Sequence, residues 1–271
     1  MPAERVRIDR SACVATLTLA RPASRNALDA VAVEQLSGLL RKVGEDPGVR
    51  VVELAAAGSC FSAGADLHAM RSMGTADPAD NLADTRRFAE MLHLLHSLPK
   101  PTVARVQGPV VAGGVGLVAC CDIAVAAEDA FFRLSEVQLG LVPAMVGPYL
   151  SEALGIRRAR RLMLTAERFD ARQALRWGLV HEVVPNSALV AAAQGVIRRL
   201  LRGAPGAQAL CKELVRDFAS GPPDAAMRDR TARALAARRS SAEARAGVRS
   251  FFNKTRPPWA GGPGMQKGCE R

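Results

Sequence analysis

Hydrophobic and polar positions follow two different patterns along this chain. Up to about residue 185, short segments with the two-residue alternation of strands are separated by longer segments with helical spacing. The strand-like segments cover residues 14–19, 49–54, 102–106 and 123–126. Beyond Pro185 only helical patterns follow one another, to about Phe252. The sequence therefore predicts an α/β fold with an all-helical C-terminal region.

The ends of several segments have recognisable signals. Asp29 precedes a helical pattern over residues 29–42 and is suited to cap it. A second amphipathic helix, over residues 79–98, ends at two prolines, which cannot continue a helix. We predict three parts: a core over residues 1–185, a helical region over 186–256, and a tail over 257–271 that is flexible unless a partner holds it.

Length and composition exclude several classes of protein. A chain of 271 residues, 49% of them hydrophobic, can bury a large core. The longest uncharged apolar run, residues 109–121, is shorter than the roughly 20 residues of a membrane-spanning helix. The N-terminus has no apolar stretch typical of a signal peptide, so we expect a cytoplasmic location. Six cysteines without a C-x-x-C pattern predict reduced, mostly structural thiols.

The net charge of +11 is unevenly distributed. Residues 1–150 hold 14 basic and 16 acidic side chains, whereas residues 151–271 hold 23 and 10. We interpret most of this excess as solvated helix surface, with an anionic small molecule as the next interpretation. Nucleic acid is the least favoured partner, because single-strand binders use aromatic platforms and only 4% of this chain is aromatic.

Two familiar ligand motifs are considered and rejected. Gly114 to Ala119 fits G-x-G-x-x-A, and Glu136 lies twenty residues beyond Gly116, as in dinucleotide-binding folds. The helix that follows would have only about two turns, too few for that fold. His93 and His96 share a helix face, but no third ligand is near in sequence, so we predict no metal site.

The same glycines suit a different chemistry. Gly114 and Gly116 stand at the N-terminus of a predicted helix, and residues 60–67 form a second loop of small residues that leads into a helix. At both places backbone N–H groups are free and Gly lets a ligand approach. Two such loops could give two N–H donors to one developing oxyanion. Either loop alone is a weak signal, because Gly is common at tight turns.

Five segments in this order resemble the crotonase family, also called the enoyl-CoA hydratase/isomerase family. They cover residues 21–28, 61–67, 99–108, 113–122 and 178–185, within a likeness that extends over about residues 5–255. The resemblance implies a spiral of repeated ββα units and a C-terminal all-helical trimerisation region, hence a homotrimer or a dimer of trimers. It also implies an acyl-CoA substrate, with coenzyme A as part of that substrate and no separate cofactor.

Carried over by position, the resemblance assigns an oxyanion hole to the N–H groups of Ala65 and Gly113 and the acid/base role to Glu136. Asp66 is a structural cap in this interpretation. The resemblance also places several residues in substrate binding: Arg25 near the CoA phosphates, Ala63, Leu67, Gly116, Pro143 and, near a CoA site of its own or a neighbouring subunit, Lys254.

Two positions depart from the family pattern. Gly116 stands where two-glutamate hydratases have their other carboxylate, and Ala112 replaces the first of three glycines, which adds a Cβ beside the oxyanion hole. A single glutamate can activate water and then deliver the proton, or it can move a proton between carbons as an isomerase does.

The finer likeness is to the bacterial branch with 3-methylglutaconyl-CoA hydratase and isohexenylglutaconyl-CoA hydratase, enzymes of leucine and acyclic-terpene breakdown. In that branch the missing carboxylate could leave room for a substrate branch or a second substrate carboxylate. We therefore expect a hydratase of a branched or dicarboxylic 2-enoyl-CoA. The alternatives are an enoyl-CoA delta isomerase and an RNA- or CoA-binding protein with weak catalysis.

Overall fold

The computed structural model describes residues 4–73, 75–218, 221 and 224–260. In that part of the chain the strands form a six-stranded and a three-stranded sheet. The larger sheet has the order β1 (Val6–Ser11), β2 (Val14–Leu19), β3 (Val51–Ala56), β4 (Thr102–Val106), β6 (Ile123–Ala127) and β9 (Glu182–Val184). The smaller one has the order β5 (Pro109–Val111), β7 (Phe131–Arg133) and β8 (Phe169–Asp170).

Strand pairs followed by helices repeat along the core. In each repeat one strand joins the larger sheet and the next joins the smaller one: β4 and β5 precede α4 (Gly113–Ala119), and β6 and β7 precede α5 (Gly147–Leu154). An isolated bridge between Ser62 and Val110 adds the segment after β3 to the smaller sheet. The predicted ββα repeats and the α/β class are confirmed.

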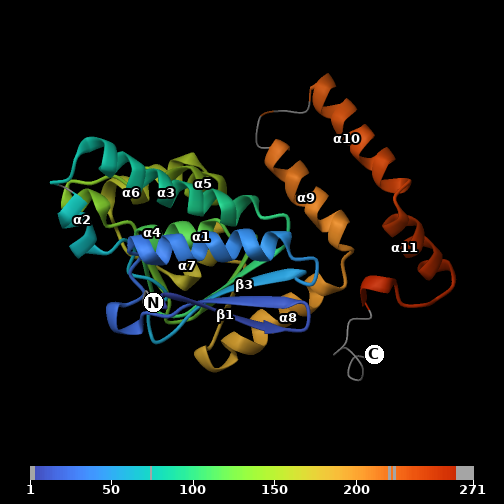
Figure 1. The fold of residues 1–271 in the computed structure, drawn as a ribbon, viewed down its shortest axis with the longest axis horizontal. Coiled ribbons are helices and arrows are strands. Elements are labelled where there is room, and N and C mark those ends of the chain that lie inside the picture. Colours follow the sequence, from blue (N-terminus) through green and yellow to red (C-terminus); the bar gives the residue numbers. More distant parts are fainter. Residues whose placement is uncertain (1–3, 74, 219–220, 222–223, 261–271) are drawn as a thin grey trace.

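The larger sheet is covered on both faces (Figure 1). On one face lie α1 (Ala30–Glu45) and α3 (Pro78–Ser97), and their buried side chains join the main hydrophobic core. Asp29 caps α1 as expected, since its carboxylate accepts a hydrogen bond from the Ala32 N–H at 2.8 Å. On the other face α8 (Leu189–Leu201) packs on β4 and β6 through a second cluster that includes Val103 and Ile197. Thus α8, which begins the predicted helical region, belongs to the core packing.

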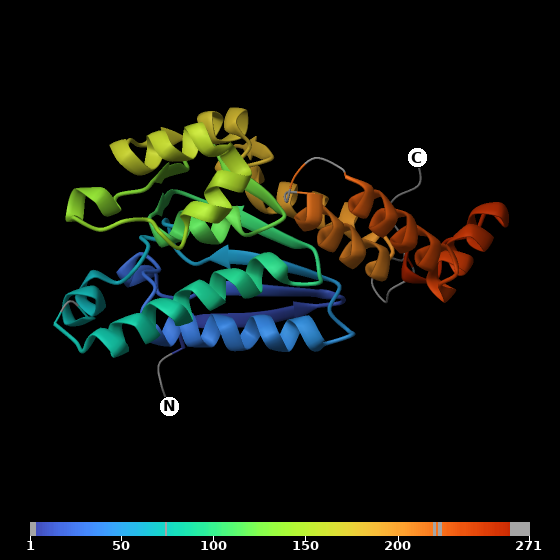
Figure 2. The same cartoon turned by 90° about the horizontal axis from the view of Figure 1, so that it is seen from above.

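The remaining helices complete the core and its extension. In the core they are α2 (Leu67–Met73), α6 (Ile156–Thr165) and α7 (Ala171–Trp177), with the short 3-10 helices η1 (Pro22–Ser24), η2 (Glu136–Leu139) and η3 (Asn186–Ala188). The extension consists of α9 (Pro205–Phe218), α10 (Ala225–Arg239), α11 (Ala242–Phe252) and η4 (Pro258–Ala260). Figures 1 and 2 both show α9–α11 projecting from one side of the core.

The extension packs little within its own chain. Neither α9 nor α11 has a buried residue, and α10 buries only Met227. A salt bridge fixes α9 to the core, with Lys212 Nζ 2.6 Å from Asp122 Oδ2. None of the helices in the described ranges is long and apolar enough to cross a membrane.

The first residues of the predicted tail over 257–271 are bonded to the rest of the chain. Residues 258–260 form η4, the Trp259 indole N–H donates to the Arg202 carbonyl at 3.1 Å, and Arg50 donates to the Trp259 carbonyl. These bonds hold the segment to its own chain, without a partner. Residues 261–271 lie outside the described part.

Candidate active site

The loop between β3 and α2 leaves the Ala65 N–H without an internal partner. Leu28 and Ala65 form a parallel bridge in which Leu28 N donates to Gly64 O and Asp66 N donates to Leu28 O, at 2.8 and 3.1 Å. In this geometry the N–H of Ala65 itself points to the other side. Among the described residues it donates to no acceptor.

The side chains of Asn26 and Ser62 hold this loop through hydrogen bonds. The buried Asn26 amide donates to the carbonyls of Ala57 and Cys60, both at 2.8 Å. Ser62 Oγ donates to the Asn26 carbonyl at 2.9 Å and accepts from the Gly64 N–H at 3.2 Å. The sequence pattern predicted no role for either side chain, although both lie in the family-like segments.

The second loop leads from β5 into α4, and the Gly113 N–H donates to no backbone acceptor in the part of the chain that the structure describes. Gly113 is the first residue of α4, so its N–H has no partner within the helix. Ala112, directly before it, has φ 50° and ψ −122°, a conformation that suits glycine far better than alanine. Its N–H donates to the Arg133 carbonyl at 2.8 Å.

The two loops touch at Gly64. A Cβ added to Gly64, which has φ +85°, would lie 2.7 Å from Ala112 Cβ, 2.8 Å from Val111 O and 3.2 Å from Gly113 N. Gly114 meets the other loop as closely, since its Cβ would lie 3.0 Å from the Ser62 carbonyl oxygen. Glycines therefore allow a backbone-to-backbone approach that places the Ala65 and Gly113 segments side by side.

Glu136 reaches this place through the smaller sheet. β7 runs parallel to β5 with Arg133 opposite Val111, and Glu136 follows three residues later as the first residue of η2. The Leu141 N–H donates to the Glu136 carbonyl at 3.0 Å, which closes the turn. The sheet thus places residue 136 and the Ala112–Gly113 backbone just beyond the ends of two neighbouring strands.

The Glu136 carboxyl group is half-buried and only partly satisfied. Its Oε2 atom is buried and makes no hydrogen bond within the described residues. Burial raises the pKa of Glu136, against a smaller lowering by a bond from its own backbone N–H. A carboxyl group with a raised pKa and a free oxygen is suited to take and give protons.

The space beside Gly116 is filled by the protein. A Cβ added to Gly116 would lie 2.9 Å from Val146 Cγ2 and 3.5 Å from the nearest Leu92 methyl carbons. Both neighbours are buried in the main core. The first atoms of the absent glutamate are therefore replaced by Val146, and the suggested room for a substrate branch is not found at this point.

The other predicted binding residues divide into three groups. Arg25 is exposed and Ala63 half-buried, and they are joined by a bond from Ala63 N to Arg25 O at 2.9 Å, while Leu67 is 60% exposed at the start of α2. Pro143 is buried in the loop before α5. Lys254 follows α11, which lies on the far side of the molecule from α2 in Figures 1 and 2. A single chain does not bring Lys254 to the others.

Of the two helical histidines, His96 contacts a glutamate and a tyrosine. His96 Nε2 lies 3.6 Å from Glu152 Oε2, and the ring of His96 lies 5.0 Å from that of Tyr149. Burial lowers the pKa of His96. The described residues contain no group of three or more His, Cys, Asp or Glu side chains placed to hold a metal ion.

Comparison with known proteins gives consistent results. The family model described as Enoyl-CoA hydratase/isomerase matches residues 9–262. A short-chain-enoyl-CoA hydratase of Clostridium acetobutylicum is 32% identical over 79% of this chain and 82% of its own. The crystal structure of an enoyl-CoA hydratase from Shewanella pealeana is 40% identical, with a TM-score of 0.92 over 94% of this chain and 96% of the other. The structure of AtuE from Pseudomonas aeruginosa is 37% identical, with a TM-score of 0.91 over 95% and 100%.

Proposed function

The chain belongs to the enoyl-CoA hydratase/isomerase family, and from this premise we propose that it adds water to the double bond of a 2-enoyl-CoA thioester, with Glu136 as acid/base. The observation that carries the proposal is the contact between two loops whose Ala65 and Gly113 N–H groups donate to no backbone acceptor among the described residues. The strand that pairs with β5 leads to a half-buried carboxyl group, Glu136, with a free oxygen. Coenzyme A enters as part of the substrate, and no separate cofactor is needed.

The proposed reaction uses two parts of the site: the backbone N–H groups of Ala65 and Gly113, and the carboxyl group of Glu136. The Ala65 and Gly113 N–H groups donate to the thioester oxygen, where negative charge develops as water adds at C3. Glu136 in its carboxylate form takes a proton from that water and, now protonated, delivers a proton to C2. Burial raises the pKa of Glu136, which stabilises the protonated form that the second step uses.

The first experiment separates hydration from double-bond migration. The protein is incubated with a 2-enoyl-CoA and with the matching 3-enoyl-CoA in deuterated water enriched in ¹⁸O, and the acyl products are analysed by mass spectrometry. Hydration predicts one ¹⁸O and one deuterium in the product of the 2-enoyl-CoA. Deuterium without ¹⁸O, from either substrate, would identify a delta isomerase instead.

The isomerase is the second candidate because one observation favours it. The centre proposed from the described residues has one carboxyl group, Glu136, and moving a proton between C2 and C4 needs only one. The protein-filled space at Gly116 leaves no position there for a second carboxylate.

The substrate is proposed to be a branched or dicarboxylic 2-enoyl-CoA such as 3-methylglutaconyl-CoA. Gly116 in place of a carboxylate lessens repulsion of an acidic acyl chain. The loop after Glu136 exposes Leu139, Leu141 and Val142, apolar side chains that could contact a branched chain. A panel of linear, 3-methyl and dicarboxylic 2-enoyl-CoA thioesters tests this. A kcat/KM highest for the linear substrates would contradict it.

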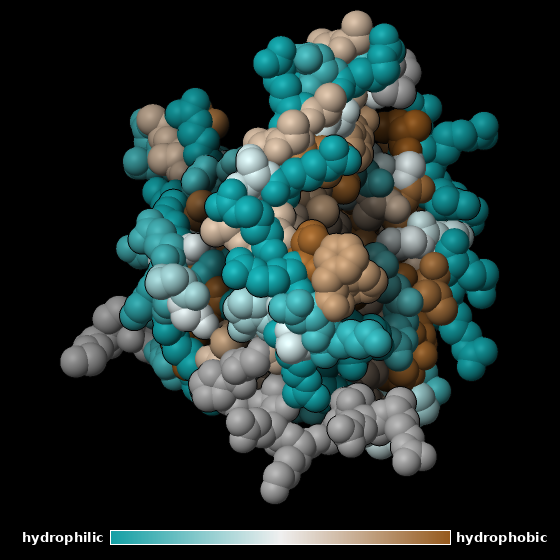
Figure 3. Space-filling model, turned by 90° about the vertical axis from the view of Figure 1, so that its right-hand side faces the viewer, coloured by the Kyte–Doolittle hydropathy of each residue, from teal (hydrophilic) through white to brown (hydrophobic). Residues whose placement is uncertain are grey.

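A homotrimer, or a dimer of trimers, is proposed from the C-terminal helices. They expose large apolar side chains that their own chain leaves uncovered: Val215, Phe218, Leu235, Val248, Phe251 and Phe252. Figure 3 faces this side and shows apolar side chains gathered among polar ones. Burial between subunits would remove them from water and could bring Lys254 to a neighbour's CoA site. Sedimentation equilibrium tests this. A monomer at micromolar concentration would contradict it.

The cytoplasmic location stays a prediction.

A further inference from the structure

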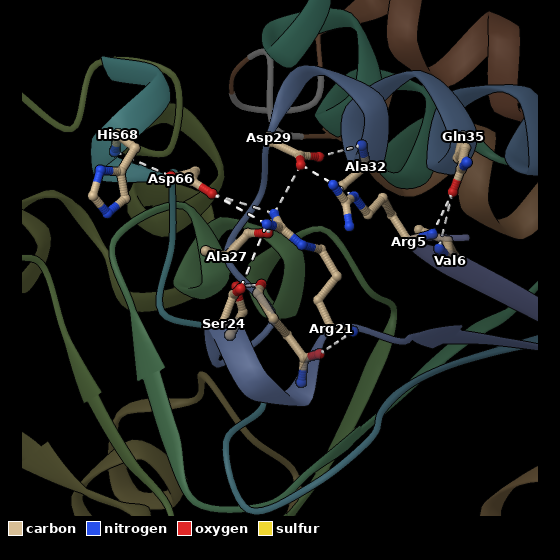
Figure 4. A network of polar contacts seen from close by, with 12 residues as sticks. Arg5, Val6, Arg21, Ser24, Ala27, Asp29, Ala32, Gln35, Asp66 and His68 are labelled. Carbon is tan, nitrogen blue, oxygen red and sulfur yellow. Dashed lines mark hydrogen bonds and ion pairs between the residues drawn. The ribbon is translucent and has the colours of Figure 1, made fainter. Parts of the chain in front are cut away.

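A half-buried network of four charged side chains includes Asp66, the residue directly after Ala65 (Figure 4). Arg21 is at its centre, with Arg5, Asp29 and Asp66 around it. The side chains of Arg21, Asp66 and Asp29 are only 14%, 15% and 17% exposed. The two positive and two negative charges balance, as burial of charge requires.

Arg21 joins both strands of the bridge that orients Ala65. Its Nη1 atom donates to the Ala27 carbonyl at 3.0 Å and lies 2.9 Å from Asp29 Oδ2, on the Leu28 side of the bridge. The same guanidinium lies 3.3 and 3.4 Å from Asp66 Oδ2, on the Ala65 side. One planar group thus holds residues 27–29 and residue 66 at a fixed separation.

Asp66 connects this clamp to the next helix. Its Oδ1 atom accepts a hydrogen bond from the His68 N–H at 3.0 Å, at the start of α2. Burial raises the pKa of Asp66, but the backbone N–H groups of His68 and Ala69 and the Arg21 guanidinium outweigh it and bring that pKa below its ordinary value. Asp66 therefore stays ionised at neutral pH and holds Arg21.

We infer that Arg21 is a positioning residue that, through Asp66 and Asp29, aims the Ala65 N–H at the thioester oxygen of the substrate. The inference rests on the proposed function. Arg21 itself touches no substrate atom in this account. Its effect appears when charge develops on that oxygen, because a donor displaced by about 1 Å loses much of its stabilisation of the transition state.

The test compares Arg21→Met with Arg21→Lys and Asp66→Asn, and uses Arg105→Met as the matched control. Arg105 forms a similar half-buried pair, with Glu53 at 2.8 Å, between β3 and β4. We expect Arg21→Met to lower kcat about 10- to 100-fold with a smaller change in KM. Arg21→Lys should restore part of the loss, because it keeps the charge but not the planar fork. Arg105→Met should lower the melting temperature while kcat stays near that of the wild type.

A spectroscopic measurement separates positioning from general destabilisation. A saturated acyl-CoA with a ¹³C-labelled thioester carbonyl binds without reacting, and hydrogen bonds to that carbonyl lower its infrared stretching frequency. The shift seen in the wild type should shrink in Arg21→Met and remain in Arg105→Met. Equal shifts and equal kcat in folded Arg21→Met and wild type would overturn the inference.

Two further outcomes keep the inference and the proposed function apart. If Arg21→Met does not fold, Asp66→Asn decides, because an amide can keep the bond to His68 while the charge on Arg21's partner is lost. An unchanged kcat and carbonyl shift in Asp66→Asn would then overturn the inference. If the wild type turns over no enoyl-CoA, or Glu136→Gln is fully active, the proposed function fails instead.

Discussion

The two halves of the site are held by different means. The N–H half is built from backbone, and Asn26, Ser62, Gly64 and Arg21 hold it through several hydrogen bonds and close contacts. The proposed acid/base half depends on one side chain, Glu136, whose Oε2 atom has no partner in the described part of the chain. The N–H half is therefore held by many contacts. The acid/base half has a single group, and the proposed proton transfer needs its unpaired oxygen atom.

This difference predicts where substitutions act. A change in the acid/base half should affect chemistry with little effect on structure. A change in the N–H half should affect both, because the atoms that position the donors also pack the loops. The predictions below follow this contrast.

Replacing Glu136 by Gln should have the largest effect on activity. The amide keeps the shape but cannot exchange protons, so kcat for a 2-enoyl-CoA should fall by about 10² to 10⁴. Affinity for a saturated acyl-CoA should change little. Steady-state kinetics and calorimetric titration measure the two quantities, and an unchanged kcat would remove Glu136 from the reaction.

The same variant should be more stable than the wild type at neutral pH. Burial raises the pKa of Glu136, so the folded state favours its protonated form. The contribution of Glu136 to stability is therefore complete below about pH 4.5, the ordinary pKa, and is lost as the pH rises through the folded-state pKa. Gln carries no charge at any pH. Thermal melts should show a higher melting temperature for Glu136→Gln at pH 7 and no difference near pH 4. A lower melting temperature at pH 7 would contradict the burial argument.

Gly64→Ala should damage the N–H half. The new methyl group would lie 2.8 Å from Val111 O at a residue with φ +85°, so the loops must separate. Loss of one aligned donor predicts a fall in kcat of about 10² to 10³, together with lower stability. The control is Gly155→Ala, which has a similar φ of +78° but no atom within 4 Å of the added Cβ. It should lose stability only, and equal kinetic losses in both variants would count against the contact.

Gly116→Ala should show that Val146 fills the space of the missing glutamate. The added Cβ would lie 2.9 Å from Val146 Cγ2, and overpacking of this kind costs about 1 to 3 kcal/mol. Gly38→Ala, at an exposed helix position with no atom within 4 Å, measures the helix-propensity gain alone. Combining Gly116→Ala with Val146→Ala should recover part of the loss in urea unfolding. Strict additivity of the two changes would contradict the packing.

Ala112→Gly should have the smallest effect. Relief of the strained φ of 50° contributes about 1 to 3 kcal/mol, and the greater freedom of glycine in the unfolded chain offsets roughly 0.5 to 1 of it. We expect a melting temperature a few degrees higher, with kcat changed less than threefold. Calorimetry and kinetics check this, and a lower melting temperature would show that Ala112 is not strained.

Most of the long elements were predictable from the sequence, whereas β1 and the shortest strands were not. The α1 cap at Asp29 and the strands β2 and β4 follow directly from periodicity and capping. β1 was not predicted from the sequence, because Val6 is its one buried residue and charged residues hide its alternation. β5, β7 and β9 have three residues each, too few for a period to appear.

The sequence indicated the residues of the candidate site, whose roles stay predictions, but it did not indicate the contacts that hold them. Small residues before helices indicated both N–H loops, and the family-like segments indicated Glu136. Nothing in the pattern could place Val146 against Gly116, thirty residues apart, or join Arg21 to Asp66, because such contacts depend on how the repeats stack.

The most direct test of the single-carboxylate account is the pH dependence of kcat/KM for a 2-enoyl-CoA, in the wild type and in Glu136→Gln. The base must be ionised to activate water, and burial raises its pKa. The account predicts that kcat/KM of the wild type falls on the acid side with a slope of about one and a midpoint above 4.5, and that the residual activity of the variant lacks this limb. An acid limb that persists in the variant would contradict it.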